Sequence, residues 1–212
     1  MLSPERVSSS SVIATRISFE DYLADYAANF CEWLDGTVIK MPSVHDYHDA
    51  IVRYLAILLE AYFEVKPIGR IRQGPFVMNL PQVRAGREPD VQIILNTNSH
   101  PLTPTFMDGP ADICIEVVSP ESVARDHGDK FQEYEKGGVR EYWIIDYLHR
   151  ECRFFRLNDD GVYIHTAEDA QGDYRTPLLS SFVFHIPILW QPNLPGPIAI
   201  GQAVQAMFNE VK

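Results

Sequence analysis

A short apolar strand followed directly by a helix start is predicted by residues 112–122, DICIEVVSPES. Residues 112–118 are almost continuously apolar and carry one acid, Glu116, near the end. Ser119-Pro120-Glu121-Ser122 is typical of a helix N-terminus, and Gly137-Gly138 is typical of a helix end. The stretch therefore predicts a buried strand and a helix that runs to Lys136.

Further elements are predicted on both sides of this stretch. Apolar residues spaced at about 3.6 predict a long helix over residues 44–63, and Asp35-Gly36 predicts a hairpin turn. Helices are also expected at 18–28 and 203–211, and strands at 31–41 (a hairpin), 68–80, 83–95, 142–146, 152–157, 162–165 and 178–188. Strands mixed with separated helices predict an α/β (α+β) fold, with a central mixed β-sheet flanked by helices. We expect a flexible leader over residues 1–16 and a single domain over residues 17–212.

Composition excludes several classes of protein. The chain has 212 residues, and its three cysteines are too few and too scattered for a disulfide framework. It has no apolar run of membrane-spanning length and no signal-peptide pattern, so we expect a cytoplasmic protein without a membrane partner. The net charge of −11 repels polyanions on average. A nucleic-acid function would therefore need a local basic patch, bound metal ions or transient contact.

Two acids interrupt strongly apolar segments. Asp90 begins the run DVQIIL, and Glu116 lies within ICIEVV. Carboxylates are rarely buried unless they are paired or bound to a metal. The alternative is that each acid lies at a strand end and reaches solvent.

A lysine is predicted on the semi-apolar face of the helix that follows the strand. Lys130 shares that face with Tyr134, although a simple i,i+4 pair with Asp126 is an equal alternative. Together with Asp90 and Glu116, the lysine could support metal-dependent hydrolysis. The two carboxylates and the backbone carbonyl of Val117 could bind Mg²⁺, with Mn²⁺ as a substitute, while Lys130 holds the attacking water.

These residues carry a resemblance to a known family. The order that carries it is Glu32, Asp35-Gly36, His48, Pro89-Asp90, Glu116-Val117-Val118-Ser119-Pro120, Asp126, Lys130, Tyr134, Gly138-Val139 and Glu141-Tyr142-Trp143. From about residue 19 to residue 157 the chain resembles the Uma-type family (second type) of restriction endonucleases, in the PD-(D/E)XK nuclease superfamily. The run from residue 116 to residue 143 is its most specific part.

The resemblance implies a restriction-endonuclease-like core and magnesium-dependent cleavage of DNA by a homodimer. The superfamily lysine normally stands two residues after the second acid, where this chain has Val118. Lys130 matches the family's lysine that has moved to the next helix, and Tyr134 matches the tyrosine that accompanies it. Glu32 and His48 match two further site positions. Without the resemblance, Glu32 would be read as a surface charge and His48 as a core histidine.

A basic patch is the best candidate for contact with DNA. Arg70, Arg72 and Arg87 would contact the phosphate backbone, or they would form a charged sheet edge that discourages aggregation. Two rival functions stay open. One is a non-catalytic dimerisation or partner-binding module, and the other is a metal hydrolase for a small phosphoester.

Overall fold

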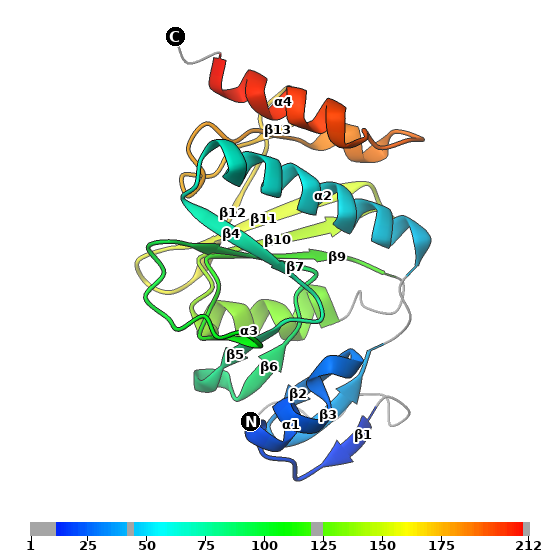
Figure 1. Ribbon diagram of the computed structural model, residues 1–212. Helices are drawn as coiled ribbons and strands as arrows, with labels where there is room; N and C mark the ends of the chain where they lie inside the picture. The colour runs from blue at the N-terminus through cyan, green and yellow to red at the C-terminus, as the bar shows by residue number, and fades with distance from the viewer. Residues whose placement is uncertain (1–11, 42–44, 120–124, 210–212) are drawn as a thin grey trace.

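The computed structural model describes residues 12–41, 45–119 and 125–209. Figure 1 shows a layered molecule that contains two β-sheets, with helices packed against them. The helices in the described residues are Phe19–Asp25 (α1), Asp46–Val65 (α2), Lys130–Gly137 (α3) and Pro197–Asn209 (α4). The predicted helices are confirmed in type, although α4 begins six residues before the predicted start. The helix start predicted at 120–122 lies outside the described residues.

The first sheet, which we call the N-terminal sheet, has the strand order β1-β3-β2-β6-β5-β8. Its strands are Val12–Thr15 (β1), Cys31–Leu34 (β2), Thr37–Lys40 (β3), Val77–Leu80 (β5), Ala85–Arg87 (β6) and Phe106–Asp108 (β8). The predicted hairpin is confirmed, because β2 and β3 pair antiparallel around Asp35-Gly36. The predicted leader is wrong for residues 12–15, where the β-branched residues of β1 pair with β3. Residues 1–11 lie outside the described residues.

The second sheet, the central sheet, has the order β12-β11-β10-β9-β7-β4. Its strands are Gly69–Gln73 (β4), Val91–Leu95 (β7), Ile113–Val117 (β9), Glu141–Asp146 (β10), Glu151–Leu157 (β11) and Tyr163–Thr166 (β12). The sheet is mixed, because β9 pairs parallel with β10 and antiparallel with β7. The predicted fold class is therefore confirmed, and the crossover from β9 to β10 is made by α3.

Two predicted strands are each divided between the sheets. The prediction of single strands over residues 68–80 and 83–95 is wrong, since β4 and β7 belong to the central sheet, and β5 and β6 to the N-terminal sheet. Pro75 lies at one break and Pro89 at the other. Proline cannot donate a ladder hydrogen bond, so the strand pairing ends there and the chain passes to the other sheet. Asp90 lies at the second of these passages.

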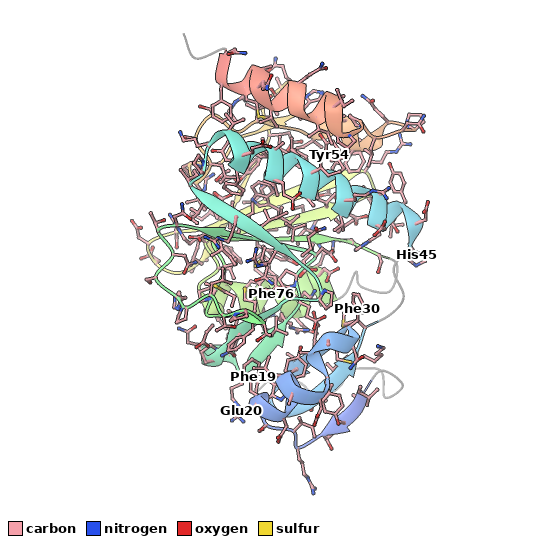
Figure 2. The ribbon with its side chains drawn as sticks, in the orientation of Figure 1. Phe19, Glu20, Phe30, His45, Tyr54 and Phe76 are labelled. Carbon is pink, nitrogen blue, oxygen red and sulfur yellow. The ribbon has the colours of Figure 1, made fainter. Side chains whose placement is uncertain are left out.

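Helices cover both faces of the central sheet (Figure 1). The apolar face of α2 packs on one face of the sheet, and α4 packs on α2. On the other face lie α3 and strands β5 and β6 of the N-terminal sheet. Figure 2 shows side chains filling the spaces between these layers, with Tyr54 of α2 among them. None of the helices in the described part of the chain has the length and apolar character needed to cross a membrane.

The C-terminal region contains less strand than predicted. Residues 178–188 do not form one strand. Instead, Phe184–His185 (β14) pairs with Asp173–Tyr174 (β13), and a 3₁₀ helix follows over Ile186–Trp190. Pro187 near the start of that helix explains why the extended strand stops. Aromatic side chains of this region pack in the core against α2 and the central sheet.

Candidate active site

The two predicted carboxylates meet at one edge of the central sheet. Val91 of β7 is opposite Ile115 of β9 in an antiparallel register, which places Asp90 next to Glu116. Asp90 Oδ2 accepts a hydrogen bond of 2.7 Å from the Val117 backbone N–H. The two acids that are expected to share one cation therefore lie side by side, while their role as metal ligands stays a prediction.

Glu116 has an ammonium and a phenol as its partners. Its Oε1 lies 2.8 Å from Lys130 Nζ and accepts a 2.7 Å hydrogen bond from Tyr134 Oη. Both partners come from α3, one helical turn apart. Lys130 is the first residue of α3 and follows a π-helical turn over Arg125–Asp129, a local distortion that often marks functional sites. The structure thus brings together the lysine, the tyrosine and the acid that the resemblance selects.

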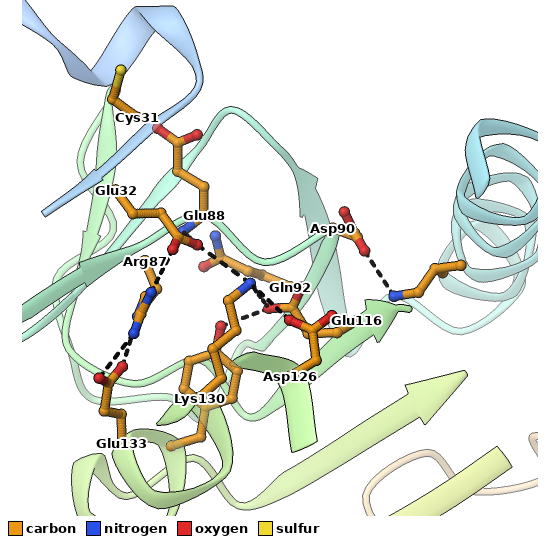
Figure 3. A network of polar contacts seen from close by, with 12 residues as sticks. Cys31, Glu32, Arg87, Glu88, Asp90, Gln92, Glu116, Asp126, Lys130 and Glu133 are labelled. Atoms are coloured by element: carbon orange, nitrogen blue, oxygen red, sulfur yellow. Dashed lines mark hydrogen bonds and ion pairs between the residues drawn. The ribbon is translucent and has the colours of Figure 1, made fainter. Parts of the chain in front are cut away.

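Lys130 also contacts acids from two other elements. Its Nζ lies 3.3 Å from Glu32 Oε1 on β2 and 3.7 Å from Asp126 Oδ1 in the π-helical turn (Figure 3). The Lys130 side chain is 2% exposed, so these contacts are shielded from solvent. Glu32 therefore lies in the site as a partner of Lys130, and the surface-charge interpretation of Glu32 is wrong.

Arg87 does not face solvent. Its guanidinium donates two hydrogen bonds to Glu133, of 2.6 and 2.9 Å, and a third to Glu32. The side chain is 1% exposed. The prediction that Arg87 contacts DNA phosphate is wrong, because both sides of its planar fork are already occupied by buried carboxylates. Its charge instead balances Glu32, the partner of Lys130.

His48 of α2 reaches the same edge of the sheet. Its Nε2 lies 3.1 Å from Asp90 Oδ2, and the two form an ion pair when the imidazole is protonated. Burial lowers the pKa of His48, but the hydrogen bond to Asp90 and the charges of Asp90 and Glu116 outweigh it and leave the pKa raised. The core-histidine interpretation is therefore incomplete, since the imidazole is buried and also directed at a candidate metal ligand.

The site holds more acid than base. Burial raises the pKa of Glu116 to about 8, although Lys130 opposes this shift. Burial, with the charge of Glu32, also raises the pKa of Glu88 to about 8. The buried network contains five acids and two bases, namely Glu32, Glu88, Glu116, Asp126 and Glu133 with Arg87 and Lys130. A bound cation would stabilise the ionised form of these acids, so the excess of buried carboxyl groups favours the binding of a cation.

The raised pKa values predict that the protein loses stability as the pH rises. The folded state keeps a proton on Glu88 up to about pH 8, whereas an unfolded glutamate loses it near pH 4.3. The folded state therefore binds more protons between these values, and the free energy of unfolding falls with pH. Between pH 6 and pH 8.5, without metal, Glu88→Gln should reduce that fall by about 2 kcal/mol.

Urea denaturation at the two pH values measures this effect. Glu60→Gln, on the exposed face of α2, is the matched control for the loss of one carboxylate and should leave the fall unchanged. A Glu88→Gln protein with the same pH dependence as wild type would contradict the assignment of a raised pKa to Glu88.

The residues present fit a hard divalent cation. Within the described residues, all hydrogen bonds and ion pairs shown for the two carboxylates use Asp90 Oδ2 and Glu116 Oε1. Asp90 Oδ1 and Glu116 Oε2 are therefore the oxygens that a metal ion would find available. The Val117 N–H points to Asp90, and the carbonyl of a strand residue points the same way as its N–H. The Asp90 side chain is 23% exposed, which opens this edge to solvent.

The donor set also limits which metals suit the site. No three His, Cys, Asp or Glu side chains in the described ranges come together in a way that could hold a metal ion by themselves. A site on Asp90 and Glu116 would therefore depend on the Val117 carbonyl and on waters. Mg²⁺ suits such a set, because it accepts few carboxylates and keeps several waters.

Two of the predicted DNA-contacting arginines lie outside the buried network. Arg70 and Arg72 lie on the edge strand β4, where Arg70 is exposed and Arg72 stacks over the Phe76 ring at 5.6 Å. Their contact with phosphate stays a prediction. Sequence reasoning missed Glu133 and Glu88, whose partners are distant in the chain. The available signal for Glu133 was its spacing of three residues from Lys130, which places both on one side of a helix, whereas Glu88 lies between Arg87 and Pro89 and has no such signal.

Residues 18–185 match the model of the Uma2 family, described as "Putative restriction endonuclease". No curated protein sequence matches the chain. The fold resembles a crystal structure described as "a putative nuclease belonging to DUF820" from Anabaena variabilis, with a TM-score of 0.62 and 16% identity. The match covers 76% of this chain and 89% of that chain.

Proposed function

The chain belongs to the Uma2 family, and from that premise we propose that it is a divalent-metal-dependent endonuclease that hydrolyses phosphodiester bonds of DNA. The observation that carries the proposal is the position of Lys130, whose Nζ lies 2.8 Å from Glu116. The strand position of the usual lysine is the buried apolar Val118. A lysine from the next helix therefore supplies the ammonium beside the second acid.

The chain's own residues have distinct parts in this proposal. Asp90, Glu116 and the Val117 carbonyl would hold the metal, which supplies a Lewis acid for the phosphodiester. Lys130 would hold the attacking water, and its charge lowers the pKa of Glu116 against the larger effect of burial. Tyr134 fixes the rotamer of Glu116 through the hydrogen bond from its Oη. His48 orients Asp90 from the opposite layer, as a neighbour of a metal ligand commonly does.

Recognition of DNA would depend on few cations. Arg70 and Arg72 on β4 are the candidates for phosphate contact, and β4 ends beside Asp90, since the Gly74 N–H donates to the Asp90 carbonyl. The net charge of −11 predicts weak binding of long duplexes, and two phosphate contacts predict only a shallow dependence of the affinity on salt. A homodimer would bring two such sites to the two strands of a duplex, and sedimentation of the protein with and without DNA measures this.

A cleavage assay tests the proposal. Wild-type protein should convert supercoiled DNA to nicked and linear forms with Mg²⁺ or Mn²⁺, and should not with chelator. Lys130→Met should lower the rate about 100-fold or more, because the ammonium that positions the water is lost. Lys136→Met, an exposed lysine of the same helix, is the matched control.

Two kinds of outcome would reject the proposal, and a third would change only its substrate. Metal-independent cleavage, or equal rates for wild type and Lys130→Met, would remove the assigned site. No cleavage of any DNA form by wild type, together with no saturable Mg²⁺ binding in calorimetry, would favour the non-catalytic module. Hydrolysis of a small phosphoester in the absence of DNA cleavage would keep the site and change the substrate.

A further inference from the structure

Gln92 is a buried amide beside the active-site network that the proposed function does not use. Its side chain is fully buried, and its Nε2 donates a 2.6 Å hydrogen bond to the Phe76 carbonyl. This bond fixes the orientation of the amide, because exchanging Oε1 and Nε2 would place two acceptor oxygens 2.6 Å apart. Gln92 Oε1 is buried and has no hydrogen-bond partner in the described part of the chain.

The unpartnered oxygen is on the side of the sheet that carries Glu116. Gln92 of β7 is opposite Cys114 of β9, and Glu116 lies two residues along the same strand. Residues at i and i+2 of a strand share one face, so Gln92 and Glu116 are diagonal neighbours within reach of long side chains. In Figure 3 the Gln92 amide points into the network, on the side of Glu32 and Lys130.

A buried acceptor without a donor is costly, so a donor must be supplied. The guanidinium of Arg87 is already directed at Glu133 and Glu32. Lys130 contacts Glu116 and Glu32 at 2.8 and 3.3 Å, while Asp126 at 3.7 Å is beyond hydrogen-bond distance. The ammonium is therefore attracted to acids on opposite sides, and a further neutral acceptor would define its direction.

We propose that Gln92 is a positioning residue for Lys130, and that its Oε1 accepts a hydrogen bond from one buried water that in turn accepts from Lys130 Nζ. Only the expected effect of Gln92 on the rate of cleavage rests on the proposed function. A neutral oxygen suits this part, because it directs the ammonium without adding a sixth buried acid to the network. Glu32 Oε1, 3.3 Å from Lys130, would be a third partner of the same water.

A double-mutant cycle tests the contact without any reference to activity. Gln92→Met removes the acceptor at nearly constant volume, and Lys130→Met removes the donor. In urea denaturation, the midpoint of the double mutant should lie about 0.4 M above the value expected if the two effects were additive. Gln92→Met combined with Lys136→Met is the matched control and should be additive, since Lys136 is exposed at the far end of α3.

Two further measurements cover the case in which Lys130→Met does not fold. A high-resolution crystal structure of the wild type should show a water about 2.5–3.0 Å from Gln92 Oε1. In the cleavage assay, Gln92→Met should lower kcat about 10-fold and leave the KM for DNA unchanged. A dry Oε1, an additive cycle, or a kcat equal to wild type would overturn the proposal. Because the cycle and the crystal structure need no turnover, an inactive wild type would reject the proposed function and leave this inference to be judged on them.

Discussion

Glu116→Gln is expected to lower metal-dependent cleavage of DNA by about 1,000-fold or more while the protein stays folded. The carboxylate is the buried member of the candidate metal site, and its neutral amide has only one oxygen to offer and no charge. The same carboxylate holds Lys130 at 2.8 Å, so its loss affects both the metal and the ammonium. Losses of this size are typical when a group that stabilises transition-state charge is removed.

The fold should tolerate this change. A glutamine side chain is isosteric with that of Glu116, and its single oxygen would still accept the hydrogen bonds from Tyr134 and Lys130. Burial raises the pKa of Glu116 to about 8, so above that pH the wild type bears a buried charge that the variant lacks. We therefore expect the thermal midpoint of Glu116→Gln at pH 8.5 to equal or exceed that of wild type.

Cleavage assays measure the catalytic effect of Glu116→Gln, and calorimetry measures its effect on Mg²⁺ binding. Glu116→Gln should abolish saturable Mg²⁺ binding, whereas Glu60→Gln, on the exposed face of α2, should bind and cleave like wild type. A Glu116→Gln protein that cleaves DNA at the wild-type rate would show that the catalytic centre is elsewhere. Loss of cleavage with unchanged Mg²⁺ binding would show that Glu116 acts on Lys130 and not on the metal.

Much of the candidate site follows from local sequence. The acid within the apolar run of residues 113–118 predicts a buried carboxylate that has a partner, and Glu116 is buried beside Lys130. The 3.6 period of the following helix predicts a semi-apolar face with Lys130 and Tyr134, and both are buried there. These inferences succeed because period and burial are local properties of one strand or helix.

The parts that could not be predicted depend on distant partners. Arg87 looks like a surface cation in sequence, and only the meeting of β2, β6 and α3 places it between Glu32 and Glu133. The two-sheet arrangement was missed for a different reason. Pro75 and Pro89 stand inside segments that otherwise look like continuous strands, and such a proline is a signal that pairing ends.

Arg87→Met is expected to destabilise the protein by about 3–5 kcal/mol, the largest stability effect of any single substitution in this network. Methionine fills a similar volume but leaves Glu32 and Glu133 buried without their counter-charge. Those two acids raise the pKa of the guanidinium well above its usual value, against the lowering effect of burial. For a chain of this size the thermal midpoint should fall by about 10 °C.

A second arginine of the chain provides the control. Arg84 pairs with Asp35 at 2.6 Å, but both side chains are 69% exposed. Arg84→Met should therefore cost at most about 1 kcal/mol, although the two ion pairs are equally short in the structure. Equal losses for the two variants would contradict the burial argument.

Substitution of the two acids that bind Arg87, together with a DNA-binding assay, distinguishes a structural role of this arginine from a role in DNA binding. If the cost comes from uncompensated carboxylates, adding Glu32→Gln and Glu133→Gln to Arg87→Met should recover part of the lost stability, because amides are cheaper to bury than charges. Arg87→Met should also bind a short duplex at pH 7 with the affinity of wild type, at a temperature where both are folded. A variant of wild-type stability that had lost affinity for DNA would instead reinstate Arg87 as a phosphate contact.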